Sequence, residues 1–282
     1  MTPYHIRKIL VPVDLSETSL NALDTAVHLA RQHDAALELL NVVENNFDHV
    51  TDESSVSISD SNCSDVLTAL AAAIEHAGNI KPIVIQQEGN VTETIVRHSM
   101  LLPSDLIVMG THGASGFRNG FIGSNAYGVI KHAACPVLII PPKRKFISFK
   151  KPLFPVRPVT GALLRFDVVS QFLSKNAFMD VLGLSYRMLE KESGILDKLI
   201  YEIEDGLQLS GTKARPAWNK SNIISEDVLQ SAVENDSDLI VVTSALDVTT
   251  KPNFIGPHSQ KIINCSRVPV LSVKKISVPF MA

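Results

Sequence analysis

Short apolar runs alternate with longer amphipathic stretches along the first 140 residues. The runs have the length of buried strands, and the stretches between them repeat apolar residues at helical spacing. The expected strands lie at about 9–13, 37–43, 82–86 and 106–109, and the expected helices at about 16–30, 67–74 and 92–100. We expect Thr92 and Glu93 to cap the third helix, and residues 44–62, rich in Asn, Asp, Ser and His, to form an exposed loop. Strands alternating with helices predict βαβ crossovers and a parallel sheet.

The second half of the chain repeats the pattern of the first. SDLIVVT at 237–243 matches SDLIVMG at 104–110, an offset of 133 residues. KPLFPVR at 151–157 matches KILVPVD at 8–14 with an offset of 143, so the second copy is ten residues shorter between its first and fourth strands. We therefore expect two tandem copies of one fold. The expected boundaries are a first domain at 1–142, a linker at 143–150 and a second domain at 151–282.

A glycine-rich stretch follows the fourth expected strand. Gly110, Gly113 and Gly123 are spaced Gly-x2-Gly-x9-Gly-Ser, and a helical pattern opens at Ser124. Glycines where a strand enters a loop let the backbone approach a ligand, and a helix N-terminus offers free N–H groups. This combination is typical of an anion site, above all for phosphate. The alternative is that the glycines shape a turn and bind nothing.

This spacing resembles the nucleotide-binding signature of the universal stress protein family. CPVLIIP at 135–141 follows the helix as it does in that family, and KILVPVDLSE at 8–17 is similar to the family's first strand and turn. The resemblance covers residues 1 to about 142. It implies an α/β fold of two tandem Rossmann-like (adenine nucleotide alpha hydrolase-like) domains, each an open five-stranded parallel sheet with helices on both faces. It also implies an internal pseudo-dimer, packed through the last strands at 135–140 and 268–273, with a homodimer of the whole chain left open.

The resemblance also implies which residues bind an adenine nucleotide. Pro12, Val13 and Asp14 would line the base and ribose, and Val42 would pack against adenine. The phosphates would lie on backbone N–H groups of the glycine stretch. The expected binding set is Pro12, Val13, Asp14, Val42, Met109, Gly110, His112, Gly113, Gly123, Ser124 and Asn125. The expected ligand is ATP, AMP or ADP, with any Mg²⁺ held by the phosphates and no metal ligand from the protein.

The second copy lacks most of these residues. At the positions that match Asp14, Gly110, Gly113 and Ser124, it has Arg157, Thr243, Leu246 and Pro257. Leu246 would obstruct the approach of the backbone to a ligand, and Pro257 removes an N–H group from the helix start. Gly256 remains, at the position of Gly123. We therefore predict one competent nucleotide site, in the first domain.

Composition and charge narrow the classes of partner. The 282 residues are 45% hydrophobic with a net charge of −3, which gives no reason to expect nucleic acid. The apolar runs are far shorter than the roughly 18 residues of a membrane span, so we expect no membrane partner and a cytoplasmic protein. The cysteines have no paired spacing, which disfavours disulfides and zinc. Cys135 and Cys265 precede apolar strands and are expected to be buried.

These patterns favour a stress-response protein that binds adenine nucleotide in its first domain and regulates an unknown protein partner, without being an enzyme. Two alternatives remain open. One is a scaffold that acts through its surfaces without nucleotide. The other is a slow ATP hydrolase using His112 and Arg118, although a Gly-x4-Gly-Lys-Ser/Thr loop, a nucleophile elbow and a metal-ligand cluster are missing from the sequence. Asp14 also has an alternative role, as a helix-entry carboxylate ahead of Ser16.

Overall fold

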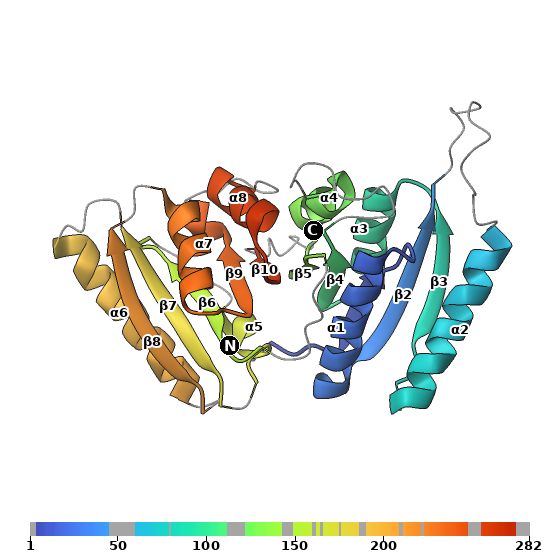
Figure 1. Cartoon of the computed structure of the whole chain (residues 1–282), viewed down its shortest axis with the longest axis horizontal. Helices are drawn as coiled ribbons and strands as arrows, with labels where there is room; N and C mark the ends of the chain where they lie inside the picture. Colours follow the sequence, from blue (N-terminus) through green and yellow to red (C-terminus); the bar gives the residue numbers. More distant parts are fainter. Residues whose placement is uncertain are drawn as a thin grey trace, which may run out of the picture.

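The two halves of the chain lie side by side, each a sheet with its own helices (Figure 1). The structure is a computed structural model. It describes residues 4–44, 60–78, 80–111, 122–142, 149–159, 162–163, 166–174, 176–185, 190–208, 211–220, 223–247 and 255–274. Most of the expected polar loop and of the expected linker therefore lies outside the described residues, and the domain boundaries stay a prediction.

Strands and helices alternate in both halves. The first half contains β1 (Lys8–Pro12), α1 (Glu17–His33), β2 (Ala36–Val43), α2 (Asp60–Gly78), β3 (Ile83–Glu88), α3 (Val91–Leu101), β4 (Leu106–Gly110), α4 (Ser124–His132) and β5 (Val137–Ile140). The second contains β6 (Pro152–Val156), α5 (Phe166–Ser170), β7 (Phe178–Ser185), α6 (Glu190–Gln208), β8 (Lys213–Lys220), α7 (Ile224–Glu234), β9 (Leu239–Thr243), the short 3-10 helix η1 (Ser244–Asp247), α8 (Pro257–Cys265) and β10 (Val270–Val273).

The ten strands form one continuous sheet in the order β3-β2-β1-β4-β5-β10-β9-β6-β7-β8. Within each half all neighbouring strands are parallel, which confirms the predicted tandem α/β fold. The halves meet where β5 and β10 pair antiparallel, with Leu138 opposite Leu271 and Ile139 opposite Val270. This is the pairing of last strands that the family resemblance implies, and it merges two five-stranded sheets into one.

Burial follows the position of each strand in the sheet. The central strands β1, β4, β5, β9 and β10 are almost wholly buried because strands pair with both of their edges and helices pack on the sheet, which explains their continuous apolar sequences. The edge strands β3 and β8 are far more exposed. Within the described residues, the helices all fall short of the length and apolar character that crossing a bilayer requires.

Two local predictions were wrong. The N-cap of α3 is Asn90, whose side-chain oxygen accepts from the N–H of Glu93 at 3.1 Å, whereas Thr92 lies inside the first turn. Cys265 is the last residue of α8 and is exposed, and the apolar strand begins five residues later, so proximity in sequence to that strand does not place this cysteine in the core. Cys135 is half-buried, and burial raises the pKa of its thiol to about 12.

Candidate functional site

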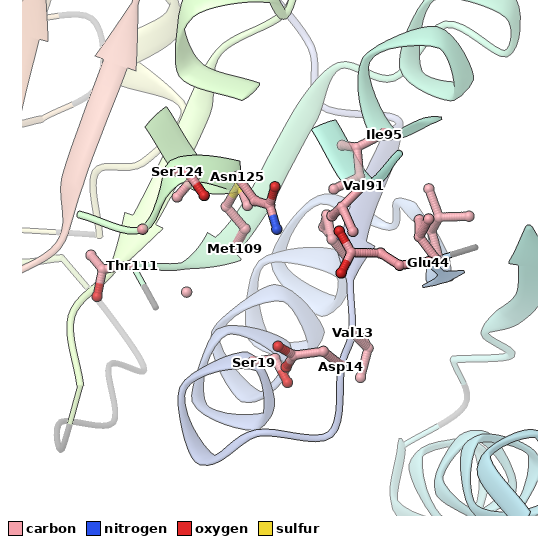
Figure 2. A pocket seen from close by; sticks show the side chains of 16 residues that line it. Val13, Asp14, Ser19, Glu44, Val91, Ile95, Met109, Thr111, Ser124 and Asn125 are labelled. Carbon is pink, nitrogen blue, oxygen red and sulfur yellow. The ribbon is translucent and has the colours of Figure 1, made fainter. Parts of the chain in front are cut away.

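A cavity of about 370 Å³ lies outside the carboxyl ends of β1, β2 and β4, beside the start of α4 (Figure 2). From β1 the strand order runs to β2 on one side and to β4 on the other, so the cavity occupies the topological switch point of the first half. Ligands of open parallel sheets bind at such points, and the volume falls within the range of small-molecule sites.

The structure brings nine of the eleven predicted site residues together around this cavity. They are Pro12, Val13, Asp14, Val42, Met109, Gly110, Gly123, Ser124 and Asn125. The other two, His112 and Gly113, lie outside the described residues, as does Arg118.

Seven further residues, which the sequence analysis did not single out, also line the cavity. They are Ser19, Leu40, Glu44, Val91, Ile95, Thr111 and Ala126. Leu40 and Glu44 could have been found from Val42, because residues two apart on a strand share a face. Val91 and Ile95 share a face of α3, but nothing in the sequence indicated that this face turns towards β1 and β2.

Asp14 has a structural role as well as a place in the cavity wall. Its Oδ1 accepts from the backbone N–H of Ser16 at 3.1 Å and from the Ser16 hydroxyl at 2.6 Å. Ser16 in turn is the N-cap of α1 and accepts from the N–H of Ser19 at 3.3 Å. Leu15 between them has a φ of 62°, which turns the chain sharply here. The helix-entry role is therefore real, and it fixes the orientation of a carboxylate that also lines the cavity.

The end of β1 is held rigidly by β2. The N–H of Val13 donates to the carbonyl of Leu40 at 2.9 Å, and the buried side-chain amide of Asn41 donates to the carbonyl of Val13 at 2.8 Å. Both main-chain polar groups of Val13 are thus satisfied before any ligand binds. This wall of the cavity is preorganised.

Two glycines of the stretch, Gly110 and Gly123, lie within the described residues. A β-carbon on Gly110 would lie 3.0 Å from backbone and side-chain atoms of Thr18, so Gly110 permits β4 to pack closely against α1. Gly123 has φ −59° and ψ 148°, a conformation open to other residues. Close packing on α1 is therefore a reason for glycine at position 110 in addition to the expected approach of a ligand.

The first turn of α4, which lines the cavity, contains N–H groups that have no acceptor within the helix. The first intrahelical bond runs from the N–H of Tyr127 to the carbonyl of Gly123, so the N–H groups of the three residues before Tyr127 have no acceptor within the helix. All three of these residues line the cavity. The N-cap makes no side-chain hydrogen bond, and in this fully described turn there is no acidic residue. The positive end of the helix dipole therefore faces the cavity and suits an anion.

The corresponding helix of the second half carries its own anion. Asp247 Oδ1 accepts from the N–H of His258 at 2.9 Å, and Oδ2 accepts from the N–H of Ser259 at 3.1 Å and from the Ser259 hydroxyl. A β-carbon on Gly256 would lie 2.1 Å from Asp247 Cγ, so Gly256 makes room for this carboxylate. The carboxylate of Asp247 thus occupies the place at the start of α8 where an external anion would bind.

Two sequence features bear on this difference between the halves. The offset of 133 aligns Asp247 with Ala114, so the first copy has no carboxylate at that position, and this comparison could have revealed the cap. Arg157, at the position of Asp14, donates from Nη1 to the carbonyl of Leu246 at 2.9 Å. Arg157 thereby holds the segment that places Asp247.

Nothing in the described residues resembles a metal centre. No group of three or more His, Cys, Asp or Glu side chains that could hold an ion occurs in the ranges given above. Asp14 and Glu44 both line the cavity, from the ends of different strands.

Comparison with known proteins gives consistent matches to one family. The family model described as Universal stress protein family matches residues 5–141. The universal stress protein YxiE of Bacillus subtilis is 30% identical over 146 residues, which cover 47% of this chain and 97% of that protein. A universal stress protein of Methanocaldococcus jannaschii is 32% identical over 144 residues, covering 49% of this chain and 84% of its own length.

A solved structure matches the chain along nearly its whole length. The crystal structure of a universal stress protein from Archaeoglobus fulgidus superposes with a TM-score of 0.70 and covers 98% of each chain at 21% identity. This likeness extends the fold to both halves, whereas each of the two relatives above spans about half of this chain.

Proposed function

This chain belongs to the universal stress protein family, and from that premise we propose that its first domain binds an adenine nucleotide, ATP, ADP or AMP, whose occupancy regulates a protein partner. The observation that carries the proposal is the start of α4, where the N-cap Gly123 has no side chain and no other described residue caps the helix, and which opens into a cavity at the switch point of the sheet. A cavity with an apolar wall and a cluster of N–H donors suits a ligand that is planar and apolar at one end and anionic at the other.

The described side chains divide the cavity between the two ends of such a ligand. Val42, Val91 and Ile95 supply apolar surface for adenine, and the carboxylates of Asp14 and Glu44 accept from ribose hydroxyls or the adenine amino group. The N–H groups of the first turn of α4 take the phosphates. Figure 2 shows Val91 and Glu44 on one side of the cavity and Ser124 on the other, in keeping with this division.

We propose one nucleotide site per chain. In the second half the carboxylate of Asp247 satisfies the N–H groups that a phosphate would need, and it carries the same sign of charge as a phosphate. Pro257 at the first helical position removes one further donor. A nucleotide would have to displace a covalently attached anion there.

We propose that the first domain binds the nucleotide and is not an enzyme. The described residues that line the cavity include no histidine, lysine or arginine, the side chains that position or neutralise groups in phosphoryl transfer. Any Mg²⁺ would be held chiefly by the phosphates. The second candidate, a scaffold that binds no nucleotide, is favoured by one observation, the presence of a complete second set of five strands in which the carboxylate of Asp247 occupies the anion position at the helix start.

The test substitutes the equivalent position at the start of each of the two helices. Ser124→Asp places a carboxylate at the start of α4, where it imitates the self-capping of α8 and repels phosphates without disturbing the fold. Pro257→Ser, which places the residue of the first copy at the equivalent position of α8, is the matched control. Isothermal titration with ATP should give one site per chain for the wild type and for Pro257→Ser, and no binding for Ser124→Asp. A correctly folded wild-type chain that takes up no adenine nucleotide would leave the scaffold in its place.

A further inference from the structure

One hydrogen bond joins the second half of the chain to the start of α4. The backbone N–H of Ile122 donates to Oδ1 of Asn264 at 3.1 Å, across 142 residues of sequence. Asn264 lies in the last turn of α8, and Figure 1 shows α8 and α4 flanking the junction of β5 and β10. The contact therefore reaches the anion-binding helix of the first domain from outside that domain.

This bond and one other fix consecutive N–H groups ahead of α4. The N–H of Gly123 donates to the carbonyl of Thr111 at 2.8 Å, at the end of β4, while the N–H of Ile122 is held by Asn264. The first turn of α4 follows directly. N–H groups at a helix start bind an anion well only when they converge on it, so the direction of this backbone sets the geometry of the phosphate position.

The second half bonds the start of α4, but the equivalent contact from the first half to the start of α8 cannot form. The offset of 133 aligns Asn264 with Lys131 and Ile122 with Ile255. A lysine ammonium has no acceptor, so Lys131 cannot accept from the N–H of Ile255. The second half instead holds its own helix start with Asp247. The first half thus depends on the second for a contact that the second does not need in return.

We propose that Asn264 is a positioning residue for the phosphates of the nucleotide bound in the first domain, so that the second domain completes the site; this inference rests on the proposed function. It gives the second domain a role although its own anion position is filled. Asn264 acts on the phosphate end alone, because the base and ribose end is built from β1, β2 and α3.

The test uses full-length protein with Asn264→Leu, which removes the acceptor at nearly constant volume, and Asn264→Ala as a second variant that adds no apolar bulk. Gln260→Leu, at an exposed position of the same helix, is the control. Isothermal titration is done with ATP and with adenosine. Loss of one hydrogen bond predicts that the Kd for ATP rises about five-fold while the Kd for adenosine stays unchanged. Hydrogen–deuterium exchange at the Ile122 amide should also become faster in both variants.

The outcomes separate this inference from the proposed function. If the wild type binds ATP and the Asn264 variants bind it equally well, the inference fails and the proposed function stands. Equal weakening for ATP and adenosine also overturns it, since a general structural role would act on both. If the wild type binds no ATP, the proposed function fails first and the inference falls with it.

Discussion

Replacing Asp247 should lower the stability of the second domain, because the carboxylate of Asp247 accepts hydrogen bonds from the N–H groups at the start of α8. Asp247→Ala removes three hydrogen bonds, from the N–H of His258, the N–H of Ser259 and the Ser259 hydroxyl. Loss of a helix cap costs about 1 kcal/mol, and hydrogen bonds to a charged group are stronger than neutral ones. Because the site is only partly buried and water can replace the lost acceptor, we expect a loss of about 2 kcal/mol.

The chain offers a local reporter for this measurement. Trp218 is the single tryptophan and lies on β8, the edge strand of the second half. Its fluorescence during urea unfolding therefore follows the second domain. With a urea m-value of about 2 kcal/mol/M, a loss of 2 kcal/mol moves the midpoint down by about 1 M.

Two further variants sharpen the Asp247 result. Asp247→Asn keeps one acceptor but loses the charge, and its midpoint should fall by about half as much as that of Asp247→Ala. Glu202→Ala, at an exposed position of α6, is the control and should stay within about 0.5 kcal/mol of the wild type. A midpoint for Asp247→Ala equal to that of Glu202→Ala would refute the assignment of Asp247 as the built-in anion.

Three other substitutions test separate parts of the fold by urea unfolding followed by circular dichroism. Gly110→Val should lower stability by about 2 kcal/mol because β4 packs on α1 with no room for a side chain; an unchanged midpoint would contradict this packing. Glu38→Leu removes the buried carboxylate that bonds Lys8 at 2.9 Å and His98 at 3.1 Å, and should cost about 3 kcal/mol; a neutral result would show that the cluster adds no stability. Burial lowers the pKa of Lys274 from 10.5 to about 8, so the unfolded chain binds more protons above that pH, and stability should rise by about 1 kcal/mol from pH 8 to 9. Lys274→Met should abolish this rise, and its persistence would assign the pH dependence to another group.

The fold could be predicted from the sequence wherever the local pattern of apolar residues reflects the position of the strand in the sheet. The central strands, such as β4, are covered on both faces, so their apolar runs are continuous and easily found. The repeat of SDLIV at an offset of 133 then predicted two copies of the same unit. The cap of α3 was misplaced because Asn90 and Thr92 are both residues that favour caps, and only backbone geometry distinguishes them.

The candidate site could be predicted from the sequence only in part, because much of it depends on contacts between residues that are distant in sequence. Residues at strand ends and at the start of α4 follow from the parallel topology. Val91 and Ile95 depend instead on how α3 packs across the sheet, which periodicity does not fix. Asp247 bonds the start of α8, ten residues later in the chain, and Asn264 bonds a residue of the other domain. Neither residue lies in a recognisable motif.

The most direct test of the central claim is the nucleotide content of the purified full-length protein. The protein is denatured after incubation with ATP and removal of free ligand, and the released small molecules are identified and counted. A single first-domain site predicts about one adenine nucleotide per chain, lost in Ser124→Asp and retained in Asp247→Asn. Two nucleotides per chain, or none with the fold intact, would contradict it.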